Sequence, residues 1–213
     1  MNGRHRVNPS LPPAVEGEGA IGVLALQGAF VEHLAVLARL GVPTREVRLP
    51  EHLDGLAGLI IPGGESTVIG KLMVKYGLDD AIRSFAGRGG AIWGTCAGMI
   101  LLAREVGRDQ PLLGLLDIDV ERNAYGSQLA SFEEDIALTR FGITDLRAVF
   151  IRAPVVSRVG PSVTTEATDG RGNIVAVSDG RLLGTSFHPE LTDDGRLHGW
   201  FAALARDRLV IAH

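Results

Sequence analysis

Short apolar runs along the chain alternate with segments in which apolar residues recur every three or four positions. Residues 21–26 form one continuous apolar run, which is typical of a strand buried on both faces of a sheet. Over residues 29–40 the apolar positions follow helical spacing, and Gly41 ends the pattern. Strands that alternate with helices in this way indicate parallel pairing through helical crossovers.

The alternation continues through the first half of the chain and then changes. From residue 118 to residue 187 strand signals dominate, separated by Asp-Gly and Gly-Asn turns, which favours antiparallel or mixed pairing. We therefore predict an α/β fold with three layers, in which an open, mixed, mostly parallel sheet is flanked by helices. The other predicted strands are residues 44–47, 56–61 and 90–93, and the other predicted helices are residues 67–87, interrupted near Gly77, 97–104 and 195–208.

The length of 213 residues fits a single domain. Residues 1–20 contain arginines, prolines and glycines without a continuous apolar stretch, and we expect them to form an N-terminal tail without fixed structure. One domain is predicted over residues 21–211.

Composition narrows the possible functions. The net charge of −4 argues against a nucleic-acid-binding protein, which normally carries a basic face. No apolar run approaches the roughly 18–20 residues that span a bilayer, and the N-terminal segment does not resemble a signal peptide. With one cysteine, no intramolecular disulfide can form, and a cytoplasmic location is expected.

The most informative motif is Gly94-Thr-Cys96-Ala-Gly98, placed between a predicted strand and a predicted helix. A Gly-x-Cys-x-Gly sequence at such a junction is typical of a nucleophile elbow, with sulfur in place of oxygen. The turn puts Cys96 at a helix N-terminus, which favours the thiolate, and leaves the Ala97 amide free to bind an oxyanion. A lone cysteine is more often a buried structural residue, but the glycine frame favours a nucleophile.

A cysteine nucleophile needs a base held in place by a third group, and His188-Pro189-Glu190 supplies both. Residues two apart in an extended chain point to the same side, so Glu190 can orient the His188 ring. Alone, the tripeptide is more typical of a surface turn, and it is the elbow at Cys96 that favours a catalytic interpretation. His33 and His198 fall within predicted helices and are interpreted as surface residues, and no histidine or cysteine spacing predicts a metal site.

A second glycine turn follows the strand predicted at residues 56–61. Its sequence, Pro62-Gly-Gly-Glu-Ser-Thr67, lets backbone amides approach a ligand closely, so it is a candidate second oxyanion donor and substrate contact. The alternative is an ordinary tight turn between a strand and a helix. It is not a phosphate-binding P-loop, because the Gly-Lys-Ser/Thr ending is missing.

Together these segments resemble the class I (triad) glutamine amidotransferases, which have a flavodoxin-like fold, and more narrowly the glutaminase subunits of pyridoxal phosphate synthase. The resemblance runs from about residue 21 to residue 209. The motifs that carry it are Gly22-Val-Leu-Ala-Leu-Gln-Gly28, Ile61-Pro-Gly-Gly-Glu-Ser-Thr67, Trp93-Gly-Thr-Cys-Ala-Gly-Met-Ile100, Arg122-Asn-Ala-Tyr-Gly-Ser-Gln128, Phe150-Ile-Arg-Ala-Pro154 and Thr185-Ser-Phe-His-Pro-Glu-Leu191.

The resemblance implies a role for each matching residue. The catalytic triad is Cys96, His188 and Glu190. Without the resemblance, Arg122 and Arg152 would be interpreted as ordinary surface charges. The implied oxyanion donors are Ala97, Gly63 and Gly64, and the implied glutamine contacts are Gly64, Glu65, Ser66, Arg122, Ile151 and Arg152.

The implied activity is hydrolysis of L-glutamine to L-glutamate and ammonia, without a metal or cofactor. The ammonia would be channelled to a (β/α)₈-barrel subunit that makes pyridoxal 5'-phosphate, the vitamin B6 cofactor. Alternatives are the glutaminase of another synthase, such as imidazole glycerol phosphate synthase, or a chaperone- or protease-like protein with a similar cysteine elbow. In that last group a histidine commonly follows the nucleophile, whereas this chain has Ala97. A catalytically silent regulatory subunit is disfavoured because all three triad positions are occupied.

Overall fold

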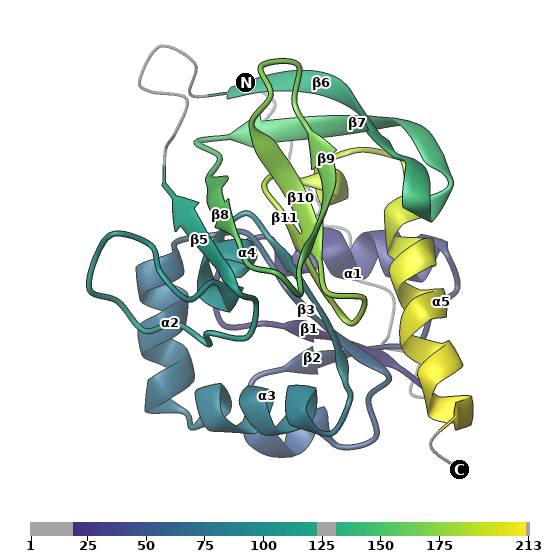
Figure 1. Cartoon of the computed structure of the whole chain (residues 1–213). Helices are drawn as coiled ribbons and strands as arrows, with labels where there is room; N and C mark the ends of the chain where they lie inside the picture. The colour runs from purple at the N-terminus through teal and green to yellow at the C-terminus, as the bar shows by residue number, and fades with distance from the viewer. Residues whose placement is uncertain (1–18, 123–130, 212–213) are drawn as a thin grey trace, which may run out of the picture.

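The computed structural model describes residues 19–122 and 131–211 (Figure 1). Most of the segment predicted to lack fixed structure, residues 1–18, lies outside the described residues, and so does most of the motif that begins at Arg122. Ala20 is buried, and its carbonyl accepts a hydrogen bond from the Ala57 amide at 3.0 Å. No helix in the described residues combines the length and apolarity needed to cross a bilayer.

Nine strands of the described residues form one sheet (Figure 1). In chain order they are β1 (Ile21–Leu24), β2 (Thr44–Val47), β3 (Gly58–Ile61), β4 (Ala91–Thr95), β5 (Ile118–Glu121), β8 (Val155–Val159), β9 (Thr164–Thr168), β10 (Ile174–Ser178) and β11 (Leu182–Thr185). Their spatial order is β2-β1-β3-β4-β11-β10-β8-β5, with β9 beside β10.

The sheet has a parallel half and an antiparallel half. The strands β2, β1, β3, β4 and β11 pair in parallel. The pairs that join β11, β10, β8, β5 and β9 are antiparallel. The predicted open, mixed and mostly parallel sheet is therefore confirmed. A separate antiparallel hairpin is made by β6 (Ser131–Leu138) and β7 (Ile143–Ile151), which are joined by the 3-10 helix η3 (Thr139–Phe141).

Helices cover both faces of the sheet. On one face lie α2 (Ser66–Lys75), α3 (Leu78–Gly87) and α4 (Ala97–Leu102), and on the other lie α1 (Phe30–Arg39) and α5 (Arg196–Ile211) (Figure 1). The predicted interruption near Gly77 is confirmed, because α2 ends at Lys75 and Gly77 takes a left-handed φ of 68°. A residue without a Cβ accepts that conformation without steric cost.

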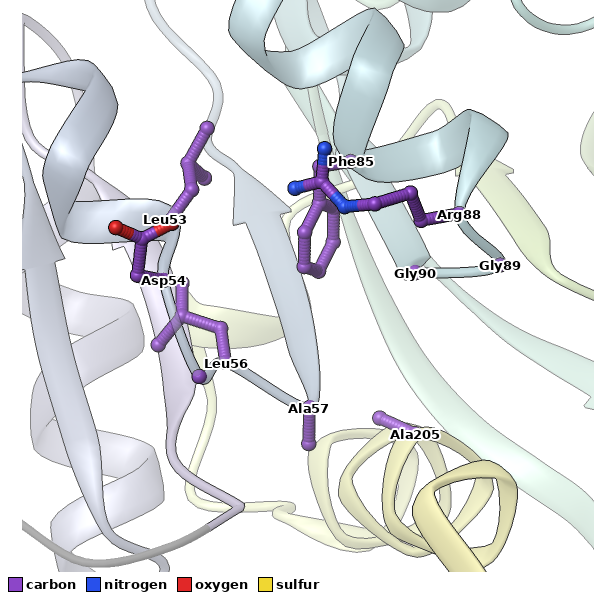
Figure 2. Close-up of a pocket in the computed structure, with 10 residues that line it drawn as sticks. Leu53, Asp54, Leu56, Ala57, Phe85, Arg88, Gly89, Gly90 and Ala205 are labelled. Atoms are coloured by element: carbon purple, nitrogen blue, oxygen red, sulfur yellow. The ribbon is translucent and has the colours of Figure 1, made fainter. Parts of the chain in front are cut away.

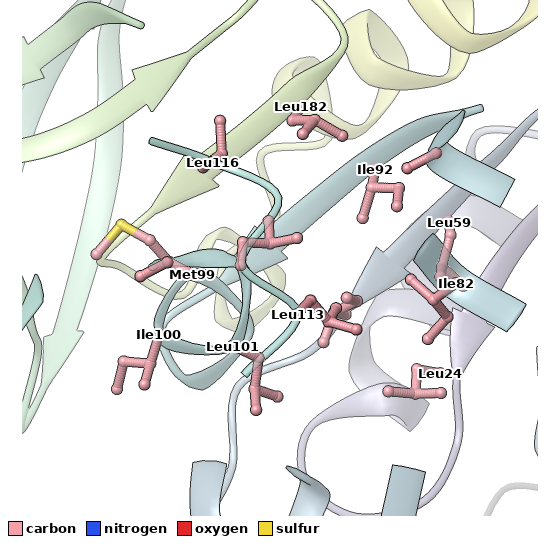
Figure 3. Packing of buried hydrophobic residues seen from close by; sticks show 14 of the residues in the cluster. Leu24, Leu59, Ile82, Ile92, Met99, Ile100, Leu101, Leu113, Leu116 and Leu182 are labelled. Atoms are coloured by element: carbon pink, nitrogen blue, oxygen red, sulfur yellow. The ribbon is translucent and has the colours of Figure 1, made fainter. Parts of the chain in front are cut away.

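Two apolar clusters, one on each face, hold these layers together. Leu59 and Ile61 of β3 face α2, α3 and α4, and the intervening Ile60 faces α1 and α5. Figure 3 shows the first cluster, where Leu59 and Ile92 of the sheet pack with Ile82 and Leu101 of the helices. Burying each such side chain contributes about 1.5–3 kcal/mol, which fixes the strand ends that carry the candidate site.

Candidate functional site

Cys96 occupies a strained turn between β4 and α4. Its φ of 48° and ψ of −101° lie outside the regions that non-glycine residues prefer. A Cβ at Gly94 would lie 2.7 Å from the Met99 amide nitrogen, and a Cβ at Gly98 would collide with the Ile61 carbonyl. The two glycines of the motif are therefore needed for the sharp turn, and the predicted elbow is present in the structure.

The pairing of β4 with β11 explains how distant residues reach Cys96. Thr95 is in register with Thr185, and the Cys96 amide donates to the Thr185 carbonyl at 2.7 Å. Parallel strands end at the same edge of a sheet, so the segment after β11 emerges beside the elbow. The His188 amide then donates to the Val149 carbonyl at 2.8 Å, which anchors the segment against β7.

His188 joins Cys96 to Glu190. Its Nδ1 lies 2.7 Å from Oε1 of Glu190, and the ring lines the same cavity as Cys96. Burial opposes a charge on the ring, but the interactions with Cys96 and Glu190 outweigh it and raise the pKa of His188 to about 10. The ring therefore holds a proton at neutral pH, in position to donate it.

Glu190 lies behind the histidine, in the 3-10 helix η4 (Pro189–Leu191), and is 5% exposed. Burial would raise the pKa of its carboxyl group, but the neighbouring His33 and the hydrogen-bonded His188 outweigh burial and lower it. The carboxylate is therefore ionised at neutral pH and can accept a hydrogen bond from the Nδ1–H of His188. Cys96, His188 and Glu190 thus lie in the order that a covalent mechanism requires of a nucleophile, a base and an orienting carboxylate.

The glycine turn after β3 lies against the triad. A Cβ at Gly63 would collide with the His188 ring and approach the Cys96 Cβ to 3.4 Å, so no other residue fits there. The Gly63 N–H donates to Oγ1 of Thr95 at 3.0 Å, and its carbonyl accepts from the Ala29 amide at 3.0 Å. With the Gly63 N–H already engaged, the Gly64 and Ala97 amides are the candidate oxyanion donors in this conformation.

A cavity of about 410 Å³ opens over these groups. Cys96 and His188 form its floor, and the residues implied as glutamine contacts form its walls. Every one of those predicted contacts lines the cavity, whereas Glu190 and Gly63 lie behind it. The lining residues are Gly64, Glu65, Ser66, Cys96, Ala97, Ile100, Arg122, Ile151, Arg152 and His188.

The cavity walls carry opposite charges. Arg122 lies 3.2 Å from the Glu65 carboxylate, and its other nitrogen donates to Gln110 at 3.1 Å. The Glu65 carboxylate also accepts from the Thr67 amide, and that bond, followed by Arg122, lowers the pKa of Glu65. The cavity thus offers a carboxylate and two guanidinium groups, which suits a ligand bearing both an ammonium and a carboxylate.

Backbone strain is concentrated at this cavity. Within the described part of the chain, Cys96 and Arg152 are the non-glycine residues with positive φ, at 48° and 44°. Both line the cavity. Strained backbone of this kind costs about 1–3 kcal/mol per residue and persists mainly where function requires it.

Sequence reasoning was wrong about two histidines. His33 and His198 were interpreted as surface residues, yet both are fully buried. The signal was present in the sequence, because His33 lies three residues after Phe30 and four before Leu37, on the apolar face of α1. His198 lies three residues before the buried Phe201, on the apolar face of α5. Gln27, Thr95 and Ile100 lie within the motifs above but were assigned no role, and Gln110 lies outside them; all four contribute to the site.

A second cavity, of about 510 Å³, lies at the opposite end of β3 and β4 (Figure 2). Asp54 and Arg88 are its charged residues, and its other lining residues are glycines, alanines, leucines and a phenylalanine. No histidine or cysteine lines it. In the described ranges, no group of three or more His, Cys, Asp or Glu residues is arranged to hold a metal ion.

Comparison with known proteins agrees with the geometry. Residues 23–206 match the family model of the SNO glutamine amidotransferases. A pyridoxal 5'-phosphate synthase subunit PdxT of Herpetosiphon aurantiacus is 53% identical over 188 residues, which cover 86% of this chain and 99% of that protein. One of Clavibacter sepedonicus is 49% identical, covering 92% of this chain and 95% of that protein.

Solved structures extend the comparison. A crystal structure of a glutamine amidotransferase superposes with a TM-score of 0.84 at 52% identity, covering 88% of this chain and 99% of that one. PurLQS of Thermotoga maritima superposes with a TM-score of 0.62 at 17% identity, covering 91% of this chain and 97% of that one, which shows a shared fold alone. With the triad geometry, the family match and these relatives, the chain belongs to the SNO glutamine amidotransferase family.

Proposed function

We propose that this chain is the glutaminase subunit of a pyridoxal 5'-phosphate synthase and that it hydrolyses L-glutamine through Cys96, His188 and Glu190. The observation that carries the residue assignment is the arrangement at the carboxyl end of the parallel strands, where His188 hydrogen-bonds Glu190 and lines the same cavity as Cys96. Residues 21–211 act as one glutaminase domain in this proposal, with the cytoplasm as its location.

Glutamine fits the charges of the cavity. Its α-ammonium faces the Glu65 carboxylate, and its α-carboxylate faces Arg122 or Arg152 on the wall. Ser66 and the backbone at Ile151 complete the contacts. This orientation directs the side-chain amide toward Cys96 at the floor of the cavity.

The reaction proceeds in two halves. The Cys96 thiol gives its proton to His188 and the resulting thiolate attacks the carbon of the side-chain amide. The oxygen becomes an anion held by the Ala97 and Gly64 N–H groups. Removing one donor of this kind typically costs about 2.7–4 kcal/mol of transition-state stabilisation. His188 gives its proton to the amide nitrogen, the carbon–nitrogen bond breaks, and ammonia leaves a thioester on Cys96.

The second half restores the enzyme. A water molecule attacks the thioester carbon while His188 takes one of its protons. The carbon–sulfur bond then breaks, glutamate leaves, and the sulfur and the protonated His188 are ready for another cycle. Glu190 holds Nδ1 of the ring throughout, so that the other ring nitrogen stays directed at the reacting atoms.

Ammonia is largely protonated in neutral water and is then not a nucleophile, so it must reach its acceptor without entering solvent. We infer that a docked (β/α)₈-barrel synthase subunit receives it and incorporates it into pyridoxal 5'-phosphate. The names of the relatives as synthase subunits support this partner.

Mixing the chain with the candidate barrel subunit tests the proposal. The expected result is formation of pyridoxal 5'-phosphate that depends on glutamine and disappears in a Cys96→Ala variant. The proposal would be contradicted if the mixture made pyridoxal 5'-phosphate only from added ammonia and not from glutamine. Mixing with an imidazole glycerol phosphate synthase subunit is the control for partner identity.

A further inference from the structure

Two buried histidines lie directly behind the proposed triad, outside the cavity that receives substrate. His33 of α1 and His198 of α5 are both 0% exposed, and Nδ1 of His33 lies 2.9 Å from Nε2 of His198. Trp93 of β4 packs edge-on against both rings, with centroid distances of 5.8 Å to His33 and 4.9 Å to His198. The pair therefore has a fixed orientation in the core.

His33 lies close both to the carboxylate of the proposed triad and to the threonine that contacts the glycine turn. Its Nε2 lies 3.2 Å from Oγ1 of Thr95 and 3.5 Å from Oε2 of Glu190. That Thr95 oxygen also accepts the Gly63 N–H, which belongs to the glycine turn against the triad. Among the described residues, Oε2 of Glu190 has no conventional hydrogen-bond partner, so His33 is the polar group that faces it.

The hydrogen bond between the histidines decides which nitrogen of His33 carries the proton. Burial lowers the pKa of both rings, so both are neutral at neutral pH and each carries one N–H. If His33 donated to His198, its Nε2 lone pair would face the Glu190 carboxylate and the Nδ1–H of His198 would be buried without an acceptor.

The opposite arrangement has neither defect. His198 Nε2–H donates to Nδ1 of His33, and the Nε2–H of His33 then points to Glu190 and Thr95. In this arrangement Nδ1 of His198 keeps an unpaired lone pair, which is less costly to bury than an unpaired N–H, and the Thr95 oxygen accepts from both His33 and Gly63. His33 is thus a donor directed at the charged end of the triad.

We propose that His33 is a positioning residue for the glutaminase reaction: its Nε2–H holds Oε2 of Glu190 and the Thr95 hydroxyl, and so aligns the triad with the glycine turn at Gly63. The inference rests on the triad proposed above. His33 does not line the cavity and does not contact substrate, so its effect is expected in kcat rather than in KM for glutamine.

The test compares matched variants in complex with the barrel subunit, each corrected for its folded fraction by thermal unfolding. His33→Leu is expected to lower kcat by about 10- to 100-fold, because the Glu190 carboxylate loses the polar group that faces it, with KM nearly unchanged. His198→Gln removes an equally buried imidazole but keeps an N–H donor toward Nδ1 of His33, and it is expected to stay within about threefold of wild type.

Two further variants keep the test decisive if a leucine variant does not fold. His33→Gln retains an N–H at nearly the reach of Nε2 and is expected to recover most of kcat, whereas His33→Asn is one methylene shorter and is not. Equal losses in His33→Leu and His198→Gln, or equal rates in His33→Gln and His33→Asn, would mean that His33 only fills space.

A Cys96→Ala variant separates this inference from the triad proposal. If Cys96→Ala retains activity, the triad itself is wrong. If Cys96→Ala is inactive while His33→Leu keeps the wild-type kcat, the triad stands and the role of His33 is refuted.

Discussion

The two ends of the parallel strands differ in chemistry more than in shape. The cavity at the amino end is the larger, about 510 Å³ against about 410 Å³ at the carboxyl end. At the amino end, positive φ angles occur at glycines, with 72° at Gly55 and 92° at Gly89. At the carboxyl end they occur at Cys96 and Arg152, which have side chains. Strain and buried charge, rather than volume, distinguish the candidate site.

The contrast follows from the direction of the strands. Parallel strands bring several loops together at their carboxyl ends, and each loop can deliver one functional side chain to the same point. Here the loop after β3 delivers Gly63 and Gly64, the turn after β4 delivers Cys96, and the segment after β11 delivers His188. The amino ends contribute mainly packing residues such as Leu56 and Phe85.

The largest expected effect comes from removing the nucleophile at the carboxyl end. Cys96→Ala is expected to reduce glutamine hydrolysis by about 10⁴-fold or more, because the covalent route is lost. Arg88→Gln at the amino-end cavity is the matched control and should leave the rate unchanged. The rate of glutamate release, measured in complex with the partner, compares the two variants. A comparable loss of rate in Arg88→Gln would show that the two ends do not differ in function.

Glycine substitutions at the two ends should differ in their effect on stability. Gly98→Ala forces a Cβ into the Ile61 carbonyl, and we expect a loss of about 3 kcal/mol or more in the free energy of unfolding. A Cβ at Gly55 would have no heavy atom within 4 Å. Gly55→Ala should therefore lose only about 1–2 kcal/mol of unfolding free energy, the cost of a left-handed φ for alanine. Urea unfolding of both variants gives the comparison, and equal losses would contradict it.

Arg122→Gln tests the substrate wall. If Arg122 is the guanidinium that binds the α-carboxylate, its loss is expected to raise KM for glutamine about 10-fold or more with little change in kcat, since the proposed contact is the same in ground and transition states. Steady-state kinetics measure the two constants. A fall in kcat at unchanged KM would instead give Arg122 a part in the chemistry.

A pH series tests the charge on His188. Its pKa in the folded state, about 10, lies above the value of about 6.5 expected for the unfolded chain. The stability that this shift contributes is therefore complete below about pH 6.5 and is lost as the pH rises toward 10. Glu190→Gln removes one cause of the shift, so the difference in unfolding free energy between wild type and Glu190→Gln should shrink over that range. A difference in unfolding free energy that does not change with pH would contradict an ion pair between His188 and Glu190.

The smallest effect on stability is expected from Cys96→Gly. The substitution removes a small buried side chain but releases the strain at φ 48°, and the two changes nearly offset each other. The variant is expected to be inactive yet to unfold within about 1 kcal/mol of wild type. A much larger loss of stability would show that the turn at Cys96 carries little strain.

The features that the sequence predicted well are those with local signals. The apolar run before Leu26 and the glycines around Cys96 report on backbone geometry within a few residues, and the structure contains both the buried strand and the elbow. The His188–Glu190 contact is also present, but it was predicted from an extended chain, whereas Glu190 lies in the 3-10 helix η4.

The features that sequence reasoning missed depend on contacts between distant segments. Thr95 connects the elbow to Gly63, and no pattern near Thr95 in the sequence predicts that contact. His33 and His198 were misassigned because histidine is usually exposed, although their helical phase marked the buried face. Arg122 and Arg152 were singled out only through the family resemblance.

The most direct test of the central claim is covalent trapping of the nucleophile. In complex with the barrel subunit, the chain should react with the diazoketone analogue of glutamine, 6-diazo-5-oxo-L-norleucine, to give one adduct that peptide mass spectrometry places on Cys96. Excess glutamine should protect Cys96, and His188→Asn should slow the reaction. An adduct on another residue, or labelling of Cys96 that glutamine does not prevent, would contradict a cysteine nucleophile at the carboxyl end of β4.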